Sequence, residues 1–106
     1  MRKHTGALEG IEIAEWLASI DPTTFVGRAR APAWCPLAQY FEKHCGFRAV
    51  EVSAGRMWWL IGKNCWSSRN LTPHEQRFVL AVDEYVGAIS AEKALEIWQR
   101  TEGEGE

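Results

Sequence analysis

Apolar residues recur at intervals of three and four near both ends of the chain, and at intervals of two in its middle. The first spacing places side chains on one face of a helix, and the second places them on one face of a strand. The pattern predicts helices over 9–20, 34–46, 72–86 and from 90 onward, with strands over 47–53 and 56–61. The predicted fold is therefore α+β, with four helices around a small two- or three-stranded antiparallel sheet, in the order α-α-β-β-α-α.

The helix over 34–46 has the clearest boundaries. Cys35 occupies the N-cap position, and Pro36 follows at the first helical position, where its missing N–H costs nothing. Gly46 is expected at C′, where a left-handed residue commonly ends a helix. The apolar stripe consists of Leu37, Tyr40, Phe41, His44 and Cys45.

The remaining helices are predicted from similar local signals. Thr72 and Glu75 form a capping box around Pro73, and Ser90 begins the last helix in the same way. Asp21-Pro22 ends the first helix, because the residue before proline disfavours helical angles. The inward positions are expected to be Ile11, Ala14, Leu17 and Ala18, then Phe78, Val79, Val82 and Val86, then Ala91, Ala94, Leu95 and Trp98.

The central strands follow from alternation and residue type. Val50 and Val52 alternate with polar residues, and the run over 56–61 is rich in residues that favour strands. Cys65-Trp66 is predicted as a short third strand, with a loop over 67–71 and an ordered connection over 22–33. The predicted core comprises Leu17, Leu37, Phe41, Val50, Val52, Phe78, Val82 and Leu95.

The length of 106 residues predicts one domain over 9–100, with a frayed N-terminus at 1–8 and a disordered acidic tail at 101–106. Apolar residues make up 46% and charged residues 25%, which is typical of a soluble protein. No apolar run is long enough for a transmembrane helix, and the N-terminus lacks the apolar core of a signal peptide. We therefore expect a cytoplasmic protein whose three cysteines stay reduced.

Cys35 is the candidate reactive thiol. A thiol at a helix N-terminus is near the positive end of the helix dipole, which lowers its pKa. Trp34-Cys35-Pro36 resembles the start of a thioredoxin-type active site, but the second cysteine of that motif would fall at Ala38. The alternative is a buried cysteine that caps the helix.

No metal or other cofactor is expected. A zinc site would need ligands at four positions whose spacing differs from the short pairs that zinc sites use. Those positions are Cys35, His44, Cys45 and Cys65. A Cys-Pro pair also occurs at haem thiolate ligands, yet two residues are too common a pattern to indicate one.

Catalytic motifs are also missing from the sequence. It contains no nucleophile elbow, zinc-protease, Walker or dinucleotide fingerprint. Asp83 and Glu84 are adjacent and so point in different directions, while His74 falls in a capping turn and His4 in the N-terminus. A non-enzymatic protein is the interpretation that this pattern favours.

Charge is distributed unevenly along the chain. Residues 28–69 contain seven basic and two acidic residues, a net charge of +5, whereas the rest carries −7. A basic stretch that includes tryptophans suits a protein interface, and it also suits a platform for single-stranded nucleic acid. We favour a protein partner. The candidate binding surface is Arg28, Arg30, Arg48, Arg56, Trp58, Trp59, Lys63, Trp66 and Arg69.

A resemblance to small uncharacterised proteins of bacterial and phage genomes covers most of residues 11–98. The residues that carry it are Cys35-Pro36-Leu37-Ala38-x-Tyr40, Phe78-Val79, Val82-Asp83 and Ser90-Ala91-Glu92-x-Ala94-Leu95. These are caps and core positions, so the resemblance implies no activity. The small size and acidic helices are also similar in kind to phage-encoded inhibitors such as anti-CRISPR proteins, which adds inhibition of a host defence system as a further hypothesis.

Overall fold

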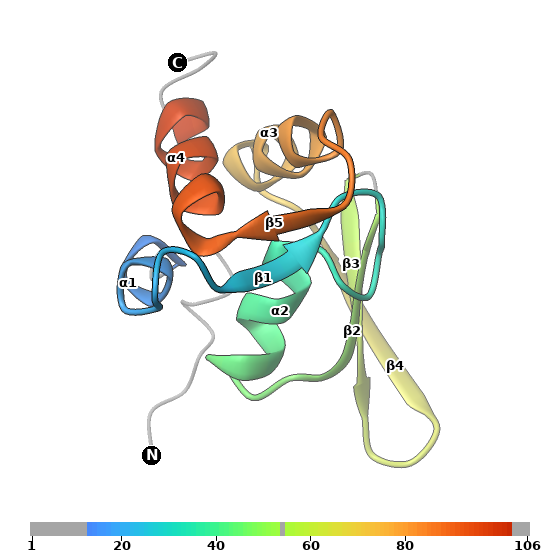
Figure 1. The fold of residues 1–106 in the computed structure, drawn as a ribbon. Coiled ribbons are helices and arrows are strands. Elements are labelled where there is room, and N and C mark those ends of the chain that lie inside the picture. Colours follow the sequence, from blue (N-terminus) through green and yellow to red (C-terminus); the bar gives the residue numbers. More distant parts are fainter. Residues whose placement is uncertain (1–12, 54, 103–106) are drawn as a thin grey trace.

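The computed structural model describes residues 13–53 and 55–102, which form four helices and five strands (Figure 1). The α+β class is confirmed, but the predicted order is wrong: the elements follow one another as α-β-α-β-β-β-α-β-α. The helices are α1 (Ile13–Ala18), α2 (Pro36–Lys43), α3 (Pro73–Val82) and α4 (Ala91–Glu102). The strands are β1 (Phe25–Arg28), β2 (Arg48–Ser53), β3 (Arg56–Ile61), β4 (Cys65–Asn70) and β5 (Ala88–Ser90).

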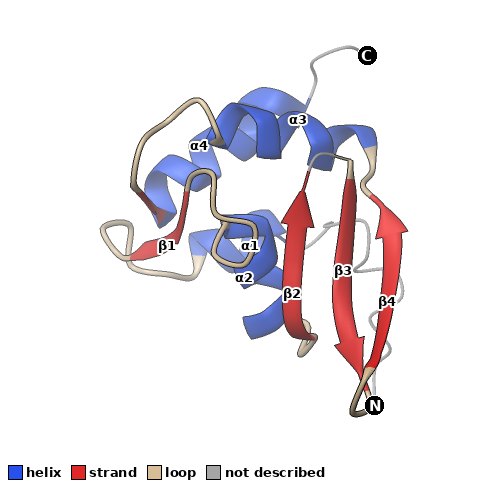
Figure 2. Ribbon diagram, turned by 90° about the vertical axis from the view of Figure 1, so that its right-hand side faces the viewer, coloured by secondary structure: helices blue, strands red, loops and turns tan. Residues whose placement is uncertain are grey.

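The strands form two antiparallel sheets instead of one. β2, β3 and β4 pair in chain order, and Figure 2 shows this three-stranded sheet beside the helices. The bounds of β3 are as predicted, and the third strand exists but continues to Asn70, so the predicted loop over 67–71 is wrong for most of its length. The sequence gives no strand signal here, because the segment contains polar residues such as Ser67 and Ser68. The stability of this strand comes from its pairing with β3.

The second sheet joins β1 to β5, two segments that lie far apart in the sequence. The connection over 22–33 is indeed ordered, but part of it is a strand. β1 is fixed by partners outside its own strand, since the Arg28 N–H donates to the Trp34 carbonyl (2.7 Å) and the Ala29 N–H donates to the carbonyl of Gly87, which is far away in the sequence (2.9 Å). Strands of four and three residues are too short to show a period of two, so their sequences did not reveal them.

Helix α2 begins as predicted. The Cys35 sulfur accepts a hydrogen bond from the Ala38 N–H at 3.4 Å, and Pro36 is the first helical residue. The helix ends at Lys43 with His44 as its C-cap, so Gly46, with φ of +82°, lies one position beyond C′. The stripe is buried except for His44, which stacks on Tyr40.

Helix α1 ends two residues before its predicted end at 20, and residues 9–12 lie outside the described range. Leu17 is buried, but Ala18 is exposed and does not face the core as predicted.

Helix α3 has the predicted capping box but ends at Val82. The reason is tertiary: the Asp83 carboxylate and carbonyl accept hydrogen bonds from the backbone N–H and the Nε of Arg30, both at 2.8 Å. This connection turns the chain toward β5, so Val86 is 87% exposed where the helical pattern predicted an inward side chain.

Helix α4 begins as predicted, because the Ser90 hydroxyl accepts a hydrogen bond from the Lys93 N–H at 3.1 Å. It continues to Glu102, which contradicts disorder from residue 101. Thr101 is buried and its hydroxyl donates to the Ile97 carbonyl at 2.8 Å, while the Arg77 Nε donates to the Thr101 carbonyl at 2.9 Å. The predicted frayed segment 1–8 and residues 103–106 lie outside the described range.

The core lies between the helices and the two sheets. Seven of the eight predicted core residues are buried, and Leu95 is half-buried at the edge. The prediction omitted several fully buried side chains, which are Ile13, Tyr40, Met57 and Ile97. None of the helices in the described part of the chain has the length and apolar character needed to cross a membrane.

Candidate binding surface on the three-stranded sheet

The three-stranded sheet has one face toward the core and one face over which none of the four described helices lies. Figure 1 shows the helices on one side of this sheet. Residues that pair directly across antiparallel strands point to the same face, and the register pairs Trp58 with both Glu51 and Ser68. We call the uncovered side the outer sheet face. Its residues are Arg48, Glu51, Ser53, Arg56, Trp58, Leu60, Trp66, Ser68 and Asn70.

Two tryptophans lie on the outer sheet face. Trp66 is 52% exposed, and it lines a shallow hollow together with Trp58 and Glu51. Trp59 points the other way and packs against the core, with its ring centroid 5.1 Å from that of Phe47. The alternation of β3 thus separates the two neighbouring tryptophans, and Trp58 is the one on the outer face.

Two arginines on this face are oriented by hydrogen bonds to the hairpin. Arg56 donates to the Ser68 hydroxyl at 2.7 Å, and Arg48 donates to the Gly62 carbonyl at 3.1 Å. Neither guanidinium has an ion-pair partner among residues 13–53 and 55–102. Lys63 is exposed in the turn between β3 and β4. The face therefore presents oriented positive charge beside aromatic rings.

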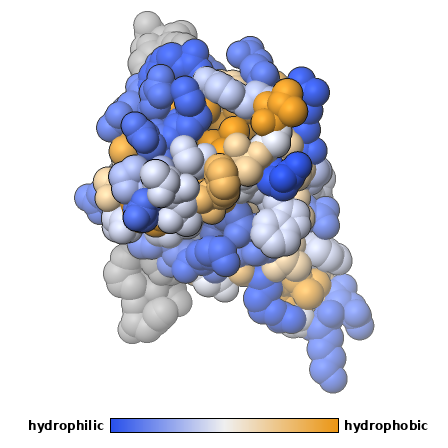
Figure 3. Space-filling model, in the orientation of Figure 1, coloured by the Kyte–Doolittle hydropathy of each residue, from blue (hydrophilic) through white to orange (hydrophobic). Residues whose placement is uncertain are grey.

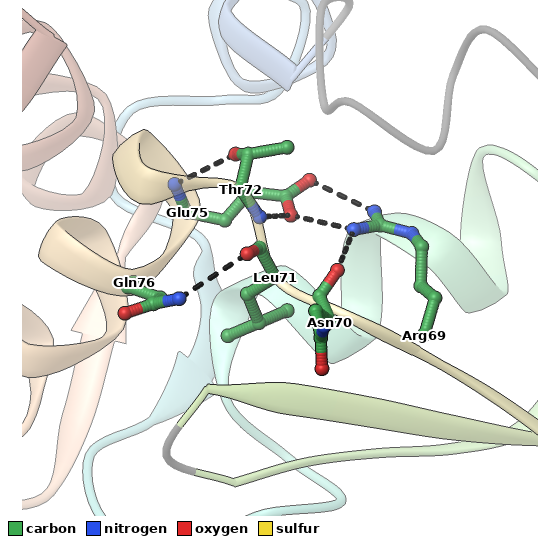
Figure 4. Close-up of polar contacts among 6 residues, drawn as sticks. All are labelled: Arg69, Asn70, Leu71, Thr72, Glu75 and Gln76. Atoms are coloured by element: carbon green, nitrogen blue, oxygen red, sulfur yellow. Dashed lines mark hydrogen bonds and ion pairs between the residues drawn. The ribbon is translucent and has the colours of Figure 1, made fainter.

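Arg69, another predicted surface residue, lies on the inner side of the sheet. Its guanidinium forms a two-point ion pair with Glu75, at 2.9 and 3.0 Å (Figure 4). It also lies 5.5 Å from the centroid of the Phe41 ring. Burial raises the pKa of Glu75, although hydrogen bonds from Thr72 and the charge of Arg69 act in the opposite direction. Arg69 therefore fastens β4 to the start of α3, and the structure does not bring it to the outer face.

Arg28 and Arg30 also lie away from the outer sheet face. Arg30 has φ of 60° and holds the end of α3 through its two hydrogen bonds to Asp83. Arg28 is exposed at the end of β1, next to a groove that Trp34 also lines. Of the nine predicted surface residues, five thus lie on the outer face or at its hairpin turn. They are Arg48, Arg56, Trp58, Lys63 and Trp66.

Glu51 and Leu60 also lie on this face, although they were not among the predicted surface residues. Both positions could have been predicted from the alternation along the strands. Leu60 is two residues from Trp58 and so points to the same side, and Glu51 alternates with the inward valines of β2. The prediction selected only basic residues and tryptophans, and it therefore omitted both.

Cys35 is buried, and the predicted low pKa is wrong. Burial raises the pKa of this thiol to about 11, and this effect exceeds that of the hydrogen bonds from the helix N-terminus, which lower it. The capping alternative is therefore the one that the structure supports. Cys45 is also buried and Cys65 is exposed. Within the described residues, no three His, Cys, Asp or Glu side chains lie close enough to hold a metal ion.

Thiol titration with a chromogenic disulfide at mildly alkaline pH should show one fast-reacting cysteine per folded chain, and three after unfolding. The fast thiol should be Cys65, because Cys35 and Cys45 are buried. A Cys65→Ser variant serves as the control and should lose the fast phase. A rapid reaction that persists in this variant would contradict the burial of the other two thiols.

Comparison with models of protein families, with curated proteins and with solved structures finds no match to this chain.

Proposed function

We propose that this protein is a non-enzymatic binding module that contacts a protein partner through the outer sheet face. The observation that carries the proposal is the uncovered pair of Trp58 and Trp66, flanked by Arg48 and Arg56. Tryptophan and arginine are the residue types that most often dominate binding energy at protein interfaces. The outer sheet face presents both residue types side by side.

The carboxylate of this face favours a protein over a nucleic acid. Glu51 lines the same hollow as Trp58 and Trp66, so a phosphate placed there would meet a negative charge. A protein partner can offer a matching basic group, as complementary interfaces do. Mixed charge around an aromatic centre thus supports a protein partner.

A non-enzymatic role is supported by where the reactive side chains lie. Cys35 is buried within the core. The His74 Nε2 is 2.9 Å from the Trp98 carbonyl and its ring stacks on the indole, so this histidine packs against α4 and is not on the outer sheet face. The outer face itself carries no histidine or cysteine that could act as base or nucleophile.

Single-stranded nucleic acid is the second candidate ligand for the same face. Aromatic rings on an open sheet, with arginines beside them, form the type of platform on which bases stack. Gel-shift titration with single-stranded DNA and RNA at two salt concentrations separates the candidates. Nucleic-acid binding should weaken steeply with salt, because phosphate contacts release counterions. No shift at micromolar protein in low salt would eliminate this candidate.

Replacing either Trp58 or Trp66 with alanine should weaken binding of the protein partner. The experiment uses the full chain as bait in a lysate of the organism that encodes it, followed by measurement with the purified partner. Each substitution is expected to weaken binding by about 2 kcal/mol, roughly thirtyfold, because a desolvated indole at an interface centre contributes at that level.

The matched control is Trp34→Ala. Trp34 is another exposed tryptophan (60%, against 52% for Trp66), but it lies near β1 and not on the outer sheet face. This variant should retain the partner. Equal loss of binding in Trp34→Ala, or unchanged binding in both sheet variants, would contradict the proposal.

A further inference from the structure

A groove of about 390 Å³ lies between β1, α1 and α2, away from the outer sheet face. Its walls include Phe25 on β1, Trp34 before α2, and Trp16 and Ile20 at α1. Figure 3 shows the face that carries β1, where apolar side chains gather over this strand and are bordered by hydrophilic ones. The volume is within the range of sites for small molecules.

The walls of the groove expose large apolar side chains to solvent. Phe25 is 68% exposed and Trp34 is 60% exposed, whereas Trp16 is held by an edge-to-face contact with Tyr40 at 5.6 Å. Both exposed rings would lose contact with water if an apolar group lay between them. Exposed apolar patches that are bordered by polar residues often mark ligand-binding grooves or interaction sites.

The groove is built into the fold, because its floor is tightly packed backbone. A Cβ placed on Gly27 would lie 2.4 Å from the Trp34 carbonyl oxygen and 2.6 Å from the Pro36 nitrogen. Only glycine lets β1 approach the start of α2 this closely. The hydrogen bond from Arg28 to the Trp34 carbonyl closes the same junction, so the walls are preformed.

The charge of the groove is positive. Arg28 and Lys43 are among its lining residues, and none of the described residues that line it is acidic. Neither cation has an ion-pair partner among the described residues. Cations beside apolar walls attract a ligand that has an apolar body and a negative group.

We propose that this groove binds a small apolar carboxylate, such as an aromatic or medium-chain acid. Its apolar body lies against Phe25 and Trp34, and its carboxylate pairs with Arg28 or Lys43. Arginine suits this role because its guanidinium can donate to both carboxylate oxygens. The site shares no residue with the outer sheet face, so it is independent of the protein interface proposed above.

The test compares charged and uncharged probes of the same shape. Naphthoate and naphthamide, together with decanoate, are titrated into the full-length protein and followed by backbone amide NMR. The carboxylates should shift signals of residues 24–28 and of Trp34, Gln39 and Lys43. Naphthoate should bind about tenfold more tightly than naphthamide, as expected for one charge-assisted hydrogen bond.

Two variants assign the charge effect to the groove. Arg28→Gln and Lys43→Gln together should weaken naphthoate binding about tenfold and leave naphthamide binding unchanged. Both residues are exposed, so the substitutions should preserve the fold. Trp58→Ala is the matched control and should leave naphthoate binding unchanged, because Trp58 is on the outer sheet face.

Three results would overturn the proposal. The first is equal affinity for naphthoate and naphthamide, which would remove the role of the cations. The second is no shift with either carboxylate at millimolar concentration, or shifts confined to the outer sheet face. The third is binding of an acidic, aromatic peptide when neither carboxylate binds, which would make the groove a docking site for protein segments.

Discussion

Replacing Arg69 with methionine is expected to destabilise the protein by about 3–5 kcal/mol. Arg69 is the ion-pair partner of Glu75, whose side chain has no exposed surface. The methionine fills similar space but leaves the buried carboxylate without its ion-pair partner. A domain of this size is stable by about 5–15 kcal/mol, so urea denaturation should show a much lower midpoint.

The effect should depend on pH in a defined direction. Burial raises the pKa of Glu75 above its ordinary value of 4.5, and the charge of Arg69 lowers it. A carboxyl group with a raised pKa contributes stability that is fully present below 4.5 and is lost as the pH rises through its folded value. Removal of Arg69 raises that pKa further. The cost of Arg69→Met should therefore be larger at neutral pH than near pH 4.

A second substitution isolates the charge. Glu75→Gln keeps a residue that can complete the capping box with Thr72 but carries no charge. Arg69→Met should lower the free energy of unfolding by less in the Glu75→Gln background than in the natural sequence. The control is Arg100→Met, at an exposed arginine on α4, which should change stability by no more than about 0.5 kcal/mol. Equal costs of Arg69→Met in both backgrounds would show that the buried charge is not the cause.

Replacing Phe41 with alanine should also cost about 3–5 kcal/mol, through lost burial and the cavity left behind. Phe41 is fully buried on α2, and its ring lies 5.0 Å from Tyr40, 5.6 Å from Phe47 and 5.5 Å from the Arg69 guanidinium. It thus joins the helix to the inner side of the sheet. Chemical denaturation measures the loss.

The matched control is Phe25→Ala, which removes an exposed phenylalanine and should change stability by about 0.5 kcal/mol or less. A cost below about 1 kcal/mol for Phe41→Ala would mean that the core can collapse around this position. Because Phe41 and Arg69 are in contact, the two substitutions together should cost a different amount from the sum of the single ones.

Several features of the fold and of the site could be predicted from the sequence because their causes are local. The alternation of β2 and β3 placed Val50 and Val52 on the core side, and it required Trp58 and Trp59 to face opposite ways. The caps at Cys35, Thr72 and Ser90 were also predictable, since a capping side chain bonds to backbone only three residues away.

Features that depend on distant partners could not be predicted in this way. β1 and β5 are too short to show a period, and they exist because each supplies the other's hydrogen bonds. The thiol of Cys35 illustrates the same limit, because the helix dipole acts locally to lower its pKa while burial by the assembled core raises it more.

Long-range packing also explains why only some of the predicted surface residues share one face. The sequence predicted Arg69 as a basic surface residue. Residues 67–71 were predicted as a loop, and a loop has no alternation that would show which side chains point inward. In the structure the pairing of β4 with β3 turns Arg69 inward to Glu75 and keeps Trp66 outward beside Trp58. Local patterns therefore determined the starts of α2, α3 and α4 and the pairing of β2 with β3. Long-range pairing decided where β1, β4 and β5 form and which of the charged and aromatic residues share a face, because a strand's side chains acquire an inside and an outside only when it is paired and covered.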